Sequence, residues 1–146
     1  MSSDVQGPKS KVQGFGCTGC EMAIRRFEDI DAWKQARKVA KEIYRHSASS
    51  RFSRDFALRD QVRRAATSVM SNIAEGFDSG SDREFAHFLT YSLRSASEVQ
   101  SHLYVALDQE YLCESDFERL YADTVTFKNL IYGSIRYINK SRRTVS

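Results

Sequence analysis

The chain has 146 residues and a net charge of +3, with 41% hydrophobic and 12% aromatic residues. This length fits one domain with a real core, and the apolar content excludes an intrinsically disordered chain. No run of about 18 apolar residues occurs, so we expect no membrane span. The N-terminus lacks the charged start and apolar stretch of a signal peptide, so we expect a cytoplasmic protein.

Charge is segregated along the chain. Residues 21–64 carry 12 Lys/Arg against 7 Asp/Glu, whereas residues 75–123 carry 3 against 11. Residues 124–146 carry 5 Lys/Arg and no acidic residue. Basic and acidic regions of this kind fit either a polyanionic partner or self-association.

The cysteines predict neither a disulfide framework nor a metal site. Three cysteines in 146 residues fit a reducing compartment. Cys17 and Cys20 form a lone CxxC motif, and only Cys113 and three scattered histidines remain to complete a zinc site with four ligands. We therefore expect no bound metal and no cofactor.

The first part of the chain predicts an extension followed by one helix. We expect residues 1–26 to form a flexible N-terminal extension, because Gly, Ser, Lys and Gln dominate them. A helix is predicted over residues 32–47, with Asp31 as its N-cap. Its apolar side, at helical spacing, consists of Trp33, Ala36, Ala40, Ile43 and Tyr44. Residues 48–54 read as a polar, Ser-rich linker.

The second predicted helix covers residues 56–77, and Gly76 and Gly80 mark its end and the following turn. Its predicted buried residues are mostly small: Leu58, Val62, Ala65, Ala66, Val69 and Ile73.

Two further helices are predicted to open with capping boxes, at Ser81–Glu84 and at Ser115–Glu118. The third helix buries a set at helical spacing: Phe85, Phe88, Leu89, Ser92, Ala96, Val99, Leu103, Ala106 and Leu107. The fourth helix does the same with Phe117, Leu120, Tyr121, Thr124, Phe127, Ile131, Ile135 and Ile138. We therefore predict an all-α protein, an antiparallel up-down four-helix bundle over residues 27–141, followed by a short basic tail at 142–146.

Some apolar residues of the last two helices lie outside these buried sets. They are Leu93, Tyr104, Leu130, Tyr132 and Tyr137. Several such residues on two helices indicate a subunit interface. The alternative is that they pack under loops of a monomer.

Five basic residues share one side of the first helix. At about 100° per residue they fall within an arc of about 100°; they are Lys34, Arg37, Lys38, Lys41 and Arg45. Like charges one turn apart repel by about 0.2–0.5 kcal/mol per pair, which favours a compensating anion such as nucleic-acid phosphate. Arg63 and Arg64 extend this candidate nucleic-acid-binding surface. Two other interpretations stay open: a solvated face, and pairing with acidic residues of a neighbouring subunit, namely Asp108, Glu110, Glu114 and Asp116.

Asn72 and Glu75 of the second helix, beside Gly76, look like a catalytic pair, but the placement of the polar residues of this helix favours a structural seam. Together with Arg64, they share one arc beside the apolar side; they are Gln61, Ser68, Asn72 and Glu75, with Gly76 at the end. Such an arc is typical of interhelical hydrogen bonding. We interpret it as structural.

No other pattern predicts an active site. Glu84 and His87 have the i,i+3 spacing of di-iron bundles, but both lie off the apolar side and a second such motif is missing. The histidines have no Ser or Cys at a recognisable nucleophile spacing, and no Gly-rich phosphate loop occurs. We expect no catalytic residues and no metal ligands.

Several segments together resemble one bacterial family. They are Trp33 on the basic first helix, Gln61–Ser68 (QVRRAATS), Ser71–Gly76 (SNIAEG) and Ser95–Glu98 (SASE). They resemble the four-helix-bundle proteins first met as open reading frames in intervening sequences of 23S ribosomal RNA genes, often labelled S23 ribosomal protein. The resemblance covers about residues 27–140.

This resemblance implies a four-helix bundle that assembles as a ring-like homopentamer. A related branch comprises accessory proteins of diversity-generating retroelements, which bind nucleic acid and a reverse transcriptase through basic surfaces. We therefore expect a non-enzymatic oligomeric scaffold that binds nucleic acid electrostatically, with RNA favoured over DNA. The alternative is a protein–protein interaction adaptor for a protein encoded nearby, with no role in nucleic-acid binding.

Overall fold

The computed structural model describes residues 24–145. The predictions for residues 1–23, including the CxxC motif, fall outside this range. Within it, every regular element is a helix. The elements are η2 (Phe27–Asp29), α1 (Asp31–Ser47), α2 (Ser50–Arg54), α3 (Phe56–Asp78), α4 (Asp82–Asp108) and α5 (Glu114–Val145).

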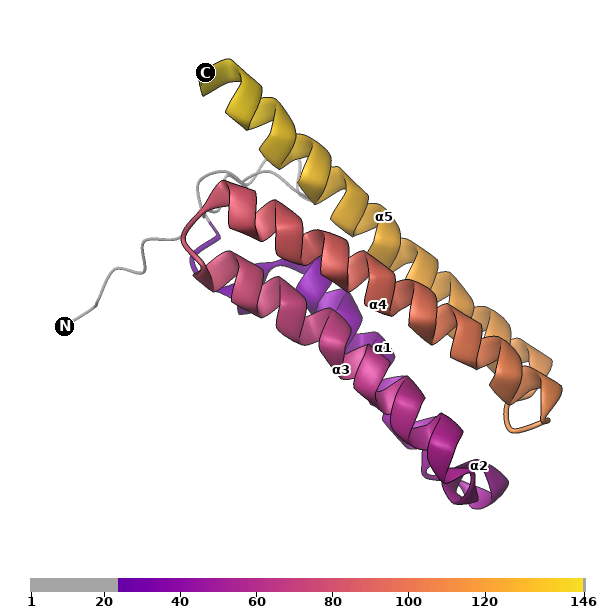
Figure 1. Ribbon diagram of the computed structural model, residues 1–146. Coiled ribbons are helices and arrows are strands. Elements are labelled where there is room, and N and C mark those ends of the chain that lie inside the picture. The colour runs from indigo at the N-terminus through magenta and orange to yellow at the C-terminus, as the bar shows by residue number, and fades with distance from the viewer. Residues whose placement is uncertain (1–23, 146) are drawn as a thin grey trace.

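The long helices α1, α3, α4 and α5 lie side by side, and short α2 lies at one end of them (Figure 1). The α4–α5 turn lies toward the same end, whereas the α3–α4 turn and the C-terminus lie toward the other (Figure 1). The all-α prediction is confirmed. Helix α5 extends past residue 141, so the predicted tail continues the last helix as far as Val145.

The helix starts agree with the sequence at one of three predicted caps. At α4, the Ser81 side chain caps the helix by accepting a hydrogen bond from the Glu84 backbone N–H at 3.2 Å, which is one half of the predicted capping box; the Ser81 N–H is directed to the Ser79 hydroxyl at 3.5 Å. At α1, Asp31 is the first helical residue and Ile30 takes the cap position, so the prediction for Asp31 is wrong. At α5, the helix already begins at Glu114, which puts Ser115 inside the first turn and rules out the second box.

The predicted linker contains helix α2, which closes one end of the core. Its Phe52 side chain is only 3% exposed, and its ring stacks on Tyr111 at 5.2 Å between centroids. Asp55 then caps α3, because its side chain accepts the Leu58 backbone N–H at 3.1 Å. The same carboxylate accepts the Tyr111 hydroxyl at 3.1 Å. The burial of Phe52 therefore holds this otherwise polar segment against the core.

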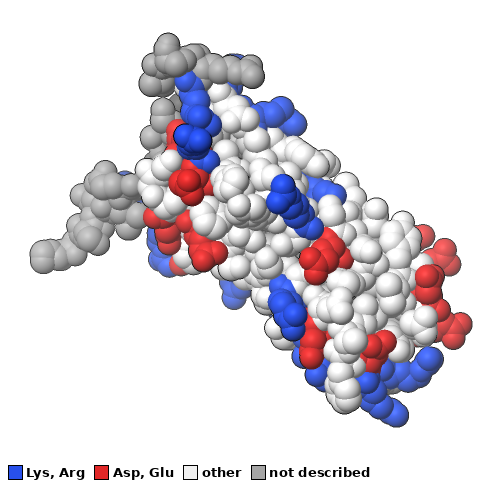
Figure 2. Space-filling view, viewed as in Figure 1, with Lys and Arg blue, Asp and Glu red and all other residues white. Residues whose placement is uncertain are grey.

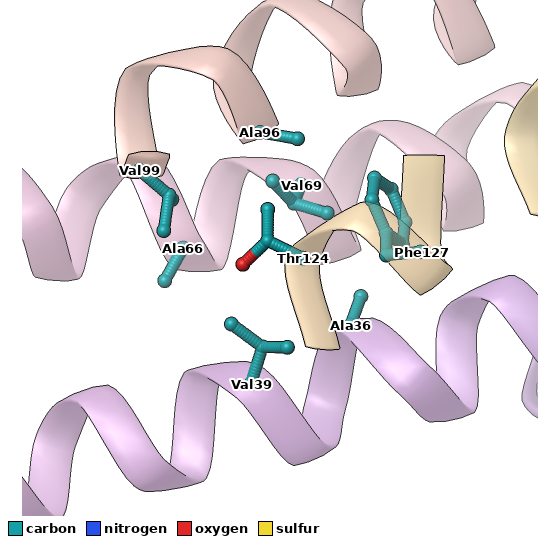
Figure 3. Close-up of a pocket in the computed structure, with 8 residues that line it drawn as sticks. All are labelled: Ala36, Val39, Ala66, Val69, Ala96, Val99, Thr124 and Phe127. Atoms are coloured by element: carbon teal, nitrogen blue, oxygen red, sulfur yellow. The ribbon is translucent and has the colours of Figure 1, made fainter. Parts of the chain in front are cut away.

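The middle of the bundle is a layer of small side chains around a small void (Figure 3). Each long helix contributes two of the lining residues, which are Ala36, Val39, Ala66, Val69, Ala96, Val99, Thr124 and Phe127. The same Ala-x-x-Val spacing recurs on α1, α3 and α4. Phe127 supplies the large side chain of this layer and is 1% exposed. Small residues at one level let the helices approach closely, so packing there is sensitive to added volume.

Most predicted core residues are buried, but Tyr44 is not: it is 44% exposed. Of the five apolar residues expected outside the buried sets, Tyr104 and Tyr132 are exposed and Tyr137 is half-buried, whereas Leu93 and Leu130 pack partly buried against the core. With Val105 and Val125, which are also exposed, Tyr104 and Tyr132 make up the exposed apolar set of α4 and α5. No helix of residues 24–145 is long and apolar enough to cross a membrane.

Candidate nucleic-acid interface

The five basic residues of α1 are all exposed. They project from one side of the helix because its opposite side is held in the core by Ala36, Val39, Ala40 and Ile43. The helix geometry thus brings the predicted residues onto one surface. We call the set Lys34, Arg37, Lys38, Lys41 and Arg45 the α1 basic face.

Part of the α1 basic face is neutralised within the chain. The Lys38 ammonium lies 3.4 Å from the Asp123 carboxylate of α5, and Arg45 binds Glu42 at 2.6 Å. The side chains of Lys34 and Lys41 have neither a hydrogen bond nor an ion pair with any residue that the structure describes. The guanidinium of Arg37 lies over the Trp33 ring, 5.9 Å from its centroid. The charge left without an acidic partner is therefore that of Lys34, Arg37 and Lys41.

A cluster of charges around His46 joins α1 to α5. The His46 ring nitrogens lie 3.9 Å from Glu42 of α1 and 3.9 Å from Asp116 of α5. Arg119 contacts both carboxylates, at 3.6 Å and 3.1 Å. Burial lowers the pKa of His46, and the neighbouring Arg45 lowers it further. A hydrogen bond from Arg45 lowers the pKa of Glu42.

Asp116 is one of the four acidic residues that the sequence offers for pairing with a neighbouring subunit. The structure places it in contact with His46 and Arg119 of its own chain. A side-chain hydrogen bond with Cys113 lowers its pKa. The other three, Asp108, Glu110 and Glu114, are exposed around the α4–α5 turn. Figure 2 shows acidic residues gathered at that end of the bundle, with basic residues beside them where α2 lies in Figure 1.

The two arginines of α3 are placed differently. Arg63 is half-buried and donates from Nε to the Ser47 hydroxyl at 2.7 Å, so it links α3 to the end of α1. Its guanidinium lies 4.6 Å from the Tyr44 ring centroid. Arg64 is exposed, and its side chain has no hydrogen bond or ion pair within residues 24–145. Arg63 therefore adjoins the α1 basic face, whereas Arg64 points to a different side of α3.

The predicted seam of α3 is structural at its centre and solvated at its ends. The Ser68 and Ser95 hydroxyls lie 2.9 Å apart and join α3 to α4. The Asn72 amide donates to the Ser68 carbonyl at 2.8 Å and to its hydroxyl at 3.1 Å. Gln61 and Glu75 are exposed, and their side chains have no hydrogen bond to the part of the chain that the structure describes. Asn72 thus braces the interhelical bond from its own helix.

Gly76 of α3 is packed closely against α4. A Cβ atom there would lie 2.6 Å from the Cβ of Phe88 and 3.1 Å from Cδ1 of Phe85. Nearby, the Ser92 hydroxyl donates to the Val69 carbonyl at 2.9 Å. The segment from Ser68 to Gly76 therefore serves to position α3 against α4.

The two histidines of α4 contact side chains of their own helix. His87 hydrogen bonds with the Tyr91 hydroxyl at 2.6 Å. His102 lies 3.6 Å from Glu98 of its own helix. Among the described residues, no group of three or more His, Cys, Asp or Glu is placed to hold a metal ion.

Sequence reasoning missed the contacts between arginines and exposed aromatic rings. The Arg59 guanidinium lies 4.8 Å from the centroid of the Phe56 ring. These two residues are three positions apart on one helix, so the sequence alone could have predicted this contact. The contact between Tyr44 and Arg63 requires knowledge of how α1 packs on α3, which the sequence pattern does not contain.

An all-helical bundle with a basic helix on its surface is the class of protein that this geometry defines. The chain belongs to the 23S rRNA-intervening sequence protein family, which it matches over residues 28–133. This match confirms the resemblance carried by Gln61–Gly76.

A solved structure has the same fold. It is the crystal structure of a protein of unknown function from the S23 ribosomal protein family of Bacteroides thetaiotaomicron VPI-5482. It matches with a TM-score of 0.65 at 22% identity, covering 71% of this chain and 97% of that chain. At this identity the similarity supports the fold alone. No curated protein matches the chain.

Proposed function

We propose that this protein is a non-enzymatic, oligomeric helical scaffold that binds nucleic acid through the α1 basic face, with RNA favoured over DNA. The observation that carries the proposal is the set Lys34, Arg37 and Lys41. These three exposed cations lie on one side of one helix, and no acidic residue in the described chain pairs with them. Neutralising phosphates would release condensed counterions, which supplies a sequence-independent free energy of binding.

The contrast with Lys38 and Arg45 supports this assignment. Both have carboxylate partners in the chain, Asp123 and Glu42. The same helix therefore has residues whose charge serves the fold and residues whose charge does not. Repulsion between Arg37 and Lys41 is retained without an internal counterion, which fits an external anion.

We also propose that the protein assembles as a homo-oligomer, with a ring-like pentamer favoured by the family resemblance. The exposed apolar set of α4 and α5 supports self-association. Tyr104 is 49% exposed and Tyr132 is 45% exposed. Burying such side chains between subunits would gain about 25 cal/mol per Å² of apolar surface.

The second candidate is a protein–protein interaction adaptor whose partner is encoded nearby. Two features favour the adaptor: the exposed apolar set and the segregated charges. The acidic residues of the α4–α5 turn are exposed, as is the α1 basic face, so either surface could bind a protein of opposite charge. Both candidates use the same bundle. They differ in what the cations of α1 contact.

Charge reversal separates the two functions. Lys34→Glu/Lys41→Glu should abolish binding of a fluorescent RNA in an anisotropy assay and leave the oligomer size unchanged by light scattering. Arg83→Glu/Arg136→Glu changes the net charge by the same amount at two exposed sites on α4 and α5, and should retain most of the affinity. Equal losses in the two variants would show nonspecific attraction to net charge. A broken oligomer in the α1 variant would favour the adaptor function.

A further inference from the structure

Three arginine–aromatic contacts line the surface formed by α1 and α3. Arg37 lies over Trp33 at 5.9 Å, Arg63 over Tyr44 at 4.6 Å, and Arg59 over Phe56 at 4.8 Å. The first pair belongs to α1, the third to α3, and the second joins the two helices. They therefore form a row and not three unrelated contacts.

Helix geometry fixes the direction of this row. On α1, Trp33 and Tyr44 are three turns apart and differ by only about 20° in rotation. On α3, Phe56 and Arg63 are two turns apart and also differ by about 20°. Because Arg63 meets Tyr44, the row runs along α1 and continues toward the start of α3, over roughly 27 Å at 1.5 Å per residue.

Two rings of the row are exposed to solvent. Phe56 is 63% exposed and Tyr44 is 44% exposed, whereas the arginine covers one side of each ring. Arg59 is itself held in place, because Nη1 donates to the Ser53 carbonyl at 3.0 Å and Nε donates to Asp60 at 2.9 Å. The fold thus fixes an arginine against each ring while leaving ring surface free.

Basic residues outnumber acidic ones around these rings. Lys41, which has no acidic partner among the described residues, and Arg45, which pairs with Glu42, are near Tyr44 in the sequence. Arg51, whose guanidinium lies over the Tyr111 ring, and Arg54 precede Phe56, and Asp55 and Asp60 are the acidic residues there. A matched pair elsewhere, Arg94 over Tyr91 at 5.7 Å, lies in the acidic part of the chain. A polyanion would be attracted to Tyr44 and Phe56 and repelled from Tyr91.

We propose that the α1–α3 surface binds single-stranded nucleic acid, with unpaired bases stacking on Tyr44 and Phe56 and phosphates contacting the flanking cations. This inference rests on the proposed nucleic-acid binding and specifies its substrate. Sequence-tolerant binding of single strands combines a basic surface with aromatic rings, because every base has a π-face. A duplex keeps its bases stacked on each other and offers only its backbone and grooves. Unpaired bases are therefore the occupant that uses both ring surface and charge.

The test compares a labelled 12-nucleotide oligo(U) with an RNA hairpin stem of 12 base pairs at one salt concentration, using fluorescence anisotropy. Tyr44→Ala and Phe56→Ala leave the charge unchanged, and each should weaken oligo(U) binding by about fivefold or more, because stacking on one ring is worth that much. Stem binding should change by less than twofold. Tyr44→Trp and Phe56→Tyr should keep wild-type affinity, since they retain an aromatic face.

Tyr91→Ala is the matched control, because it removes an arginine-paired tyrosine from α4. It should leave oligo(U) affinity unchanged. Circular dichroism melting and light scattering of each variant identify any loss of affinity that comes from unfolding or dissociation. If an alanine variant unfolds or dissociates, Tyr44→Trp and Phe56→Tyr become the deciding variants for base stacking.

The outcomes separate this inference from the proposed function. If wild-type protein binds neither RNA even at low salt, nucleic-acid binding itself is overturned. If it binds both and the alanine variants keep their oligo(U) affinity, electrostatic binding stands and base stacking is overturned. If the alanine variants lose oligo(U) and the stem equally, the rings contribute no preference for unpaired bases, and the inference is wrong.

Discussion

The Ser68 hydroxyl of α3 lies 2.9 Å from the Ser95 hydroxyl of α4, and the Asn72 amide donates to Ser68 from one turn further along. These groups sit half-buried between two helices. A polar group in such a place costs free energy when it loses its partner. The polar run of α3 is therefore best explained as helix pairing, and its removal should change stability before it changes any activity.

Asn72→Ala should lower the free energy of unfolding by about 0.5–1.5 kcal/mol, because it removes the donor that braces Ser68. Ser68→Ala should have an effect of the same size, and the double variant should cost less than the sum of the two. Thermal melting followed by circular dichroism measures all three. An unchanged melting temperature and oligomer size for Asn72→Ala would rule out its structural role.

Gly76→Ala should destabilise the protein even though alanine is the better helix former. The added Cβ would lie 2.6 Å from the Cβ of Phe88 and 3.4 Å from the Cα of Phe85, neither of which can swing aside. Overpacking of this kind costs about 1–3 kcal/mol, against about 1 kcal/mol gained in helix propensity. Chemical denaturation gives the difference. Glu75→Ala, at the exposed neighbouring position, serves as the control; a Gly76→Ala variant as stable as that control would contradict close packing here.

Acid should destabilise the contact between α1 and α5 through His46. The side chain is 12% exposed and faces Glu42 and Arg45 of α1 and Asp116 and Arg119 of α5. Its folded pKa lies below the ordinary value of 6.5. The unfolded chain therefore binds more protons between the two values, and stability falls as pH drops below about 6.5.

The pH dependence of His46→Gln measures this effect. Between pH 7.5 and 5.5 the wild-type melting temperature should fall, and the variant should show a flatter profile. The carboxyl groups of Glu42 and Asp116 also have lowered pKa values, and they withdraw stability only at still lower pH. His87→Gln, at an exposed site on α4, should keep the wild-type acid sensitivity. Identical profiles for wild type and His46→Gln would show that this histidine does not couple folding to pH.

Tyr132→Lys should break the proposed oligomer without unfolding the chain. Tyr132 is 45% exposed in the single chain, so a lysine there costs the bundle little, whereas in a subunit interface it would bury a charge. Light scattering should report a mass near 16.7 kDa for the variant and a multiple of it for the wild type. Arg136→Ala on the same helix is the control. A wild type that is already monomeric, or an unchanged mass for Tyr132→Lys, would count against this interface.

Much of the fold follows from helical periodicity, and the departures have local causes. The spacing of apolar residues predicts α1, α3 and α4 to within a residue or two. It does not predict α2, because a five-residue helix with one buried ring, Phe52, leaves no periodic signal. The Ser115–Glu118 box fails because α5 begins at Glu114, two residues before the Asp116 start that a Ser115 cap requires.

The candidate site is less predictable than the fold. The angular grouping of Lys34, Arg37 and Lys41 needs only the helix period, so the sequence displays it. The pairing of Lys38 with Asp123 joins residues 85 positions apart. It depends on the register of α1 against α5, which no local pattern encodes. For the same reason the exposure of Tyr44 and its contact with Arg63 appear only in the folded chain.

The most direct test of nucleic-acid binding by α1 is the salt dependence of RNA affinity in wild type and in Lys34→Gln/Lys41→Gln. A plot of log Kd against log salt concentration should be steep for the wild type, and its slope should fall by about 1.4 in the variant, because two contacts with single-strand phosphates are lost. Arg83→Gln/Arg136→Gln should keep the wild-type slope. A wild-type affinity that barely changes with salt, or a slope that Lys34→Gln/Lys41→Gln leaves unchanged, would contradict binding through the α1 basic face.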